Sequence, residues 1–289
     1  MKTSRHWLLI ALVAVLLAGC GVRYAYSQLD WLLPRYVRDY VTLDSVQRAE
    51  LDARLAERLQ WHCSSELPAY SAFLRDVDRS LASRELNTVQ LTAFAERAEV
   101  LWRDLLVAFA PDTGELLTML DADQIDELQQ SFDERNLKAR AEFLAPDETV
   151  REAQRIERME RRLRGWLGRM NGAQGEALAQ WSASLLPTTE AWLDNRIAWQ
   201  KRLIALLREP GEPDALRRDV AELLAAPDAG WADDYRAAVE SNRDTTLALF
   251  ARLYELADEA QRERLSRRLA SFAGQFERLA CAPRNIASG

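Results

Sequence analysis

The chain is poor in the residues that most often carry enzymatic chemistry, with two histidines and three cysteines among 289 residues. His6 falls in an N-terminal segment that we expect to be removed, so a Ser-His-Asp or Cys-His arrangement would have to use His62. Its neighbour Cys63 points about 100° away around a helix and makes a poor dyad partner. Because no His-x3-His or Cys-x2-Cys spacing occurs, we expect no metal site and interpret His62 as a structural residue.

Glycine is scarce as well, and no cluster of glycines suits a phosphate-binding loop, which surrounds the anion with backbone N–H groups. The nearest approach is the set Gly165, Gly168, Gly172 and Gly175, which we interpret as helix-packing and turn positions. The 38 basic and 45 acidic residues give a formal net charge of −7, which argues against nucleic-acid binding. We therefore expect no nucleic-acid partner and no cofactor.

The N-terminal hydrophobic run, from Trp7 to Leu17, is shorter than the roughly 20 residues that span a bilayer. It follows two basic residues, as secretory signals do, and leads into Leu17-Ala18-Gly19-Cys20. This pattern marks a bacterial lipoprotein signal. We predict that residues 1–19 are cleaved and that Cys20 receives the acyl chains, palmitate among them, that hold the protein to a membrane.

The residue after Cys20 is Gly21 rather than Asp, which is typical of lipoproteins sorted to the outer membrane. We therefore expect a lipid anchor in the outer membrane and a body in the periplasm. Two thiols then remain, Cys63 and Cys281, in a compartment where unpaired thiols rarely persist. The sequence predicts a disulfide between them. The alternative is a pair of buried free cysteines, since Cys63 lies on a helical apolar stripe.

Hydrophobic spacing is helical almost everywhere, and no segment alternates with period two as a strand would. One predicted buried face contains Leu91, Phe94, Ala98, Leu101, Leu105 and Phe109. Prolines such as Pro111 fall between the periodic segments, where we expect helices to end. Pro68 is the exception and predicts a kink or a short break near Ser64 to Pro68. The fold prediction is all-α, an irregular multi-helix bundle or array of antiparallel helices without a β-sheet.

Five segments repeat an apolar residue, Asp or Asn, two variable residues and Gln. They start at Leu43, Leu86, Leu120, Met170 and Ala257. Asp or Asn is a good N-cap, and a Gln three residues later completes a capping box, so each motif predicts a helix start. Their unequal spacing does not fit a regular solenoid, and duplication stays open. We divide the chain into the cleaved segment 1–19, a lipidated N-terminus with an aromatic-rich first helix at 20–42, and one periplasmic helical domain at 43–289.

Two sets of charged residues are candidates for function. Glu66 and Glu190 lie at helix joints beside aromatic residues, where a glycosidase or lytic enzyme could place a carboxylate. The alternative is that each acid only stabilises a helix start. Arg151, Arg155, Arg158 and Arg162 form a face that could bind an anionic envelope component such as a lipopolysaccharide phosphate. The alternative here is a solvated helix face.

Four short sequence segments together resemble a family of uncharacterised proteobacterial outer-membrane lipoproteins, whose shared domain has no known function. They are the stretches 26–33 and 39–44, Trp61-His62 followed by Glu66-Leu67-Pro68-Ala69-Tyr70, and the stretch 242–246. The resemblance implies the anchor and a helical fold and supplies no catalytic residue. Where that family has basic residues after the Trp-His pair, this chain has Cys63-Ser64.

These observations lead to three functional hypotheses. The first is a non-enzymatic lipoprotein, attached to the membrane through its N-terminal lipid, that binds or assembles another envelope protein or the cell wall. The second is a chaperone-like protein that shields periplasmic clients and needs an exposed apolar face. The third is a cell-wall hydrolase that uses Glu66 or Glu190 at the floor of a deep groove.

Overall fold

The computed structural model describes residues 21–84, 86–209 and 211–281, and these residues form helices and no strand, which confirms the all-α prediction. The helices are α2 Gly21–Tyr26, α3 Leu29–Val37, α4 Ser45–Trp61, the π-helix η1 His62–Glu66, α5 Leu67–Ala82, α6 Thr88–Thr118, α7 Ala122–Phe143, α8 Glu148–Leu167, α9 Gly172–Ser184, α10 Thr189–Arg208, α11 Pro213–Ala225, α12 Asp233–Glu255 and α13 Glu259–Leu279. The predicted signal segment 1–19 and Cys20 lie outside the described residues.

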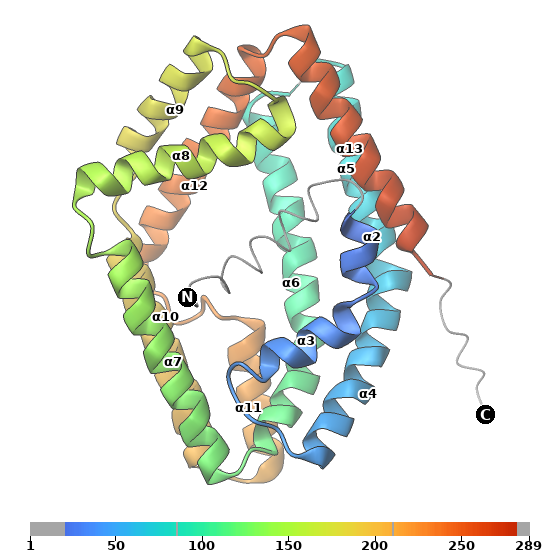
Figure 1. Ribbon diagram of the computed structural model, residues 1–289, viewed down its shortest axis with the longest axis vertical. Helices are drawn as coiled ribbons and strands as arrows, with labels where there is room; N and C mark the ends of the chain where they lie inside the picture. Colours follow the sequence, from blue (N-terminus) through green and yellow to red (C-terminus); the bar gives the residue numbers. More distant parts are fainter. Residues whose placement is uncertain (1–20, 85, 210, 282–289) are drawn as a thin grey trace.

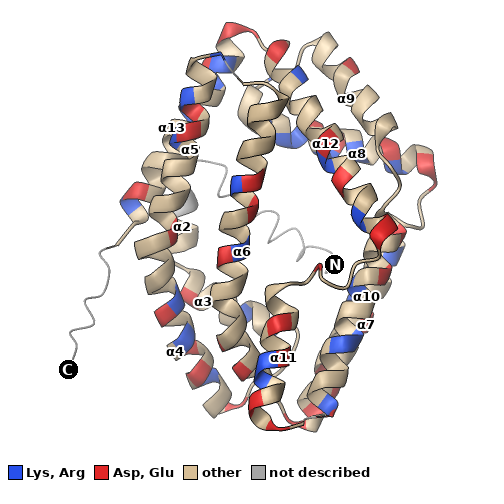
Figure 2. Ribbon diagram, turned by 180° about the vertical axis from the view of Figure 1, so that it is seen from behind, with Lys and Arg blue, Asp and Glu red and all other residues tan. Residues whose placement is uncertain are grey.

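The helices surround the long helix α6, which runs through the middle of the view in Figure 1. On one side α4 leads into α5, and α13 packs along α5; on the other side α7 and α10 form an antiparallel pair. Helices α8, α9 and α12 connect the two sides at one end. Acidic and basic residues are interspersed along the helices (Figure 2). Since α13 contacts both α2 and α5, the beginning and the end of the described chain lie together.

All five predicted helix starts form capping boxes in the structure. Four of their glutamines also meet in two buried pairs, Gln47 with Gln124 and Gln174 with Gln261. Within each pair, each side-chain amide donates to the other and to a backbone carbonyl beside the partner. Gln90, in the fifth box, is only partly buried and bonds within its own box. The same device therefore joins helix starts twice along the chain.

Buried apolar side chains form separate clusters rather than one central core. The largest joins α7, α10 and α11, and a second joins α8, α9 and α12. Helix α11 also packs closely on α6, where a Cβ at Gly114 would lie 3.3 Å from the backbone of Ala221. That contact accounts for a wrong prediction: Pro111 lies inside α6 rather than at its end. The packing of Ala110 and Gly114 on both sides of the proline offsets the lost backbone hydrogen bond.

Asn242 of α12 binds the backbone of Leu186, in the connection between α9 and α10, through both ends of its amide. Its Oδ1 accepts from the Leu186 N–H at 2.8 Å and its Nδ2 donates to the Leu186 carbonyl at 2.9 Å. Thr246, one turn later, accepts from the Trp181 indole at 3.1 Å. The phrase 242–246 therefore has a structural role, which is to attach the end of α9 to α12.

Candidate functional site

The chain changes helix type at η1, between α4 and α5. The sequence predicted a kink or a short break near Ser64 to Pro68, and the structure has a π-helix there through which the helix continues. Pro68 has no N–H to donate to the carbonyl of Ser64 and occupies the first turn of α5, where a proline costs least. In the π-helix directly before this proline, the Leu67 N–H donates to the His62 carbonyl. Such turns inside α-helices are frequent at functional sites, which draws attention to the side chains around η1.

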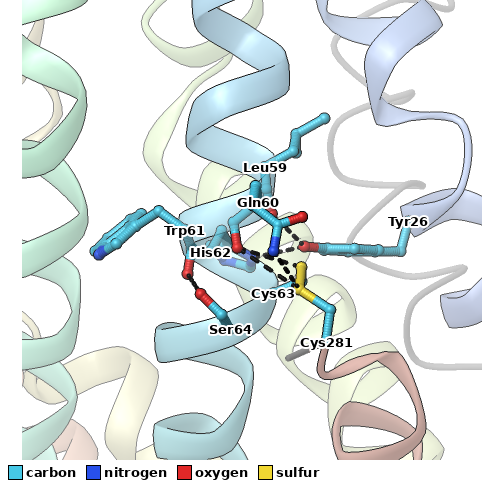
Figure 3. The surroundings of a disulfide bond; sticks show 8 residues. All are labelled: Tyr26, Leu59, Gln60, Trp61, His62, Cys63, Ser64 and Cys281. Atoms are coloured by element: carbon cyan, nitrogen blue, oxygen red, sulfur yellow. Dashed lines mark hydrogen bonds between the residues drawn. A yellow bond between two sulfur atoms is a disulfide. The ribbon is translucent and has the colours of Figure 1, made fainter. Parts of the chain in front are cut away.

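Cys63 of η1 is bonded to Cys281, which follows α13 (Figure 3). The two Cα atoms are 5.3 Å apart, and the Cys281 N–H donates to the Cys63 carbonyl at 3.1 Å. The Gln60 amide donates to the Cys281 sulfur at 3.3 Å. The predicted pairing is therefore present, and it fastens the C-terminal end of α13 to the π-helix.

The imidazole of His62 lies among aromatic rings. Its Nδ1 is 3.1 Å from the Tyr26 hydroxyl (Figure 3), and the edge-on Tyr70 ring has its centroid 5.5 Å away. Burial lowers the pKa of His62 and raises the pKa of Tyr26 to about 12. Both groups are therefore neutral at pH 7, and the imidazole Nδ1 can accept the Tyr26 O–H. Tyr26, His62 and Tyr70 come from two of the four sequence segments that carry the family resemblance.

Glu66, at the end of η1, is a buried carboxylate with 8% of its surface exposed. It is hydrogen-bonded to the Tyr70 hydroxyl, and its Oε2 has no hydrogen-bond partner among the described residues. Burial and the nearby charge of Asp104 raise the pKa of Glu66, against the opposing effect of the Tyr70 bond. General acid catalysis uses carboxyl groups whose pKa is raised, so Glu66 is a candidate for that role.

An apolar groove opens beside Tyr70, between α5, α6 and α13. Its volume is about 290 Å³, and the residues that line it are Tyr70, Phe73, Leu74, Ala98, Leu101, Trp102 and Phe276. The indole of Trp102 is 60% exposed. Tyr70 therefore belongs both to the groove and to the polar cluster at η1, whereas Glu66 lies behind it and is not part of the groove wall.

The groove exists because bulky side chains hold α5 and α6 apart. The rings of Phe73 and Phe94 meet edge to face at 6.0 Å, and Arg97 binds Asp76 at 2.9 Å. The prediction that one face of α6 is buried is therefore wrong. Ala98 is exposed, and the other residues of that stripe are only partly buried: Leu91, Phe94, Leu101, Leu105 and Phe109. Helix α5 packs on α13 instead, and α11 covers only the C-terminal part of α6.

The four arginines of the predicted anion-binding face on α8 have different surroundings in the structure. Arg151 donates to two backbone carbonyls of the connection from α7, and Arg155 donates to Ser182. Burial and the neighbouring arginines lower the pKa of Arg158, and Arg162 is exposed. An anion would therefore have to bind Arg158 and Arg162, and such binding stays a prediction.

Glu190 lies far along the chain from this cluster, exposed in the first turn of α10. Its position favours the helix dipole and matches the structural alternative. Across residues 21–84, 86–209 and 211–281, no three His, Cys, Asp or Glu side chains gather in a way that could hold a metal ion. None of the helices described is both long enough and apolar enough to cross a bilayer.

Comparison with known proteins identifies one family. The model of DUF6279, described as a family of unknown function, matches residues 39–236. Because the match covers about two thirds of the chain, the protein belongs to this family. No curated protein and no solved structure matches the chain. The matched segment contains η1, Tyr70 and Trp102, and it ends before α13 and Cys281.

The sequence did not predict the groove, although Trp102 gave a signal for it. Trp102, Val100 and Val107 lie off the predicted buried stripe of α6 and are all more than half exposed. A helix that is apolar on more than one face needs more than one partner. Here the described residues supply partners for only part of it.

Proposed function

We propose that this protein is an outer-membrane lipoprotein whose periplasmic helical body binds an apolar segment of another envelope protein. The observation that carries the proposal is the groove around Tyr70, Leu101 and Trp102. Its wall is almost entirely apolar, and it includes an exposed indole, the side chain most enriched at the energetic centres of interfaces. An amphipathic helix that lays its apolar face between two helices is a common mode of recognition.

The cellular location rests on different observations. The sequence ending at Cys20 supports lipid attachment, and Gly21 supports sorting to the outer membrane. The disulfide between Cys63 and Cys281 fits the same setting, because structural disulfides persist in oxidising compartments such as the periplasm. A protein tethered there by lipid can hold a partner close to the membrane without any catalytic group.

The test is site-specific photo-crosslinking in cells that make the full lipidated protein. The crosslinking residue replaces Trp102 in one strain and Leu137, which is 69% exposed on α7, in the control strain. We expect one defined protein adduct from position 102 and none from position 137. Many unrelated adducts at position 102 would favour the chaperone hypothesis, and equal labelling at both positions would refute a groove-specific partner. Parallel labelling with a fatty-acid analogue, lost in Cys20→Ala, tests the anchor.

A second function, cell-wall hydrolysis, is favoured by one observation, which is the buried carboxyl group of Glu66, whose Oε2 has no hydrogen-bond partner among the described residues and whose pKa is raised by burial. Glycoside hydrolysis uses two carboxyl groups, and the one that acts as the general acid has a raised pKa. Purified wild-type protein would then release soluble fragments from isolated cell wall, and Glu66→Gln would abolish the release while leaving the circular dichroism spectrum unchanged. An identical outcome for wild-type protein and Glu66→Gln would exclude this function.

A further inference from the structure

A second cavity, of about 350 Å³, lies between α7 and α10, on the other side of α6 from the groove. The two helices are antiparallel, and the wall contributed by α10 runs from Ile197 to Arg208. At 1.5 Å per residue this length is roughly 16 Å. The volume lies in the range of small-molecule sites, and the shape favours an elongated ligand.

Two neighbouring amides in the wall of this cavity are incompletely paired. Asn136 donates through Nδ2 to the Gln200 Oε1 at 2.7 Å, and both side chains are more than nine-tenths buried. Asn136 Oδ1 accepts no hydrogen bond from any described residue. No hydrogen bond from Gln200 Nε2 is present in the described part of the chain either. The wall therefore contains one unpaired acceptor, which is buried from solvent, next to one donor that has no partner among the described residues.

One open acceptor beside one open donor is the complement of a peptide group, which presents an N–H and a C=O. Because Asn136 Oδ1 is buried from solvent, a bound N–H reaches it when the amide turns about its soft terminal torsion, and this turn releases the Asn136 bond to Gln200 Oε1. Charges of both signs surround the amides, with Asp133 one turn before Asn136 on α7 and Lys201 next to Gln200 on α10. Both residues are exposed and line the cavity, where they suit an ammonium and a carboxylate.

We propose that the cavity between α7 and α10 binds the main chain of a short zwitterionic peptide. The peptide C=O accepts from Gln200 Nε2 and the peptide N–H donates to Asn136 Oδ1. The free termini lie near Asp133 and Lys201. The protein then contacts only the main chain and the charged ends of the peptide, so binding requires no particular side chain on the peptide. This site is separate from the groove and does not depend on the function proposed for it.

The experiment is a ligand-observed NMR titration of the purified protein with dialanine, which has a single peptide group. Its matched probe is alanyl-lactate, in which an ester oxygen replaces the amide N–H. We expect saturable binding of dialanine and at least about fivefold weaker binding of the ester, because the ester leaves Asn136 Oδ1 without a donor. No saturable binding of dialanine, or equal binding of both probes, would overturn the proposal.

Protein variants locate the binding. Asn136→Leu combined with Gln200→Met replaces both amides by apolar groups of similar shape, so the loss of folding stability should be small. This double variant should lose dialanine binding. Gln130→Leu makes a similar change on the exposed side of α7 and should bind as the wild type does. An equal loss in Gln130→Leu, or retained binding in a folded double variant, would place the ligand elsewhere and refute the assignment. Circular dichroism confirms that each variant is folded.

Discussion

Gln47 and Gln124 donate hydrogen bonds to each other through their side-chain amides, at 2.8 and 2.7 Å, although 77 residues separate them. Each of these glutamines also closes the capping box of its own helix. One side chain thereby completes a local helix start and a long-range contact. Gln174 and Gln261 repeat the arrangement at 2.9 and 3.0 Å.

Replacing one member of such a pair should cost more stability than losing a capping box alone. Gln47→Leu leaves the buried amide of Gln124 without its partner, which typically costs about 1–3 kcal/mol. Gln90→Leu, in the box without a partner, should cost roughly 0.5–1 kcal/mol. Urea unfolding of both variants measures the difference. Equal destabilisation would mean that the pair contributes nothing beyond capping.

Removing the disulfide should lower the free energy of unfolding. The bond between Cys63 and Cys281 closes a loop across a sequence separation of 218 residues, and the loss is expected to be about 2–4 kcal/mol. The measurement is thermal unfolding of Cys63→Ser combined with Cys281→Ser, with and without a reducing agent. A reductant should lower the melting temperature of the wild type and leave that of the double variant unchanged. If it shifts both equally, the effect does not come from this bond.

The buried Glu66 should make the protein less stable as the pH rises. Its pKa is raised in the folded state, so the unfolded chain releases this proton first. The stability contribution therefore declines as the pH rises above the unfolded value, roughly 4.3, and stays lower at neutral pH. Glu66→Gln should be more stable than wild type at pH 7 and equal to it near pH 3. Glu190→Gln, an exposed control, should show no such crossover in denaturant titrations at the two pH values.

The groove residue Trp102 should matter for binding and little for folding. Because its side chain is 60% exposed, Trp102→Ala should change the stability by about 0.5 kcal/mol or less. Leu67 is 1% exposed, so Leu67→Ala should lower the free energy of unfolding by about 2–5 kcal/mol. Chemical denaturation of the two variants provides the comparison. A large loss for Trp102→Ala would identify the indole as part of the folding core instead.

Local chemistry made much of the fold predictable from the sequence. The helix starts at Asp44 and Asp121 depend on residues within one turn, and the structure has them where the motif predicts. The pairing of Cys63 with Cys281 was predicted because lipid attachment at Cys20 would leave these two thiols in an oxidising compartment. The change of helix geometry before Pro68 was predicted, as a kink or a short break, from the missing N–H of the proline.

What the sequence could not predict depends on which surfaces meet. A capping box does not reveal that Gln47 will find Gln124, because that choice is made by the arrangement of whole helices. The stripe on α6 predicted burial, yet periodicity cannot tell whether a partner helix covers Ala98. Pro111 predicted a helix end and was overruled by the packing of Gly114 on α11.

The disulfide also determines how the body responds to tension. Helix α2 begins at Gly21, contacts α13, and reaches the π-helix through the contact of Tyr26 with His62. A pull on the N-terminal end therefore enters the body within a few residues of a covalent cross-link. Only residues before Cys63 can be drawn out, because the segment from 63 to 281 is closed on itself. A body suspended from its N-terminus would therefore take the load next to this covalent cross-link, through the contact of α2 with α13.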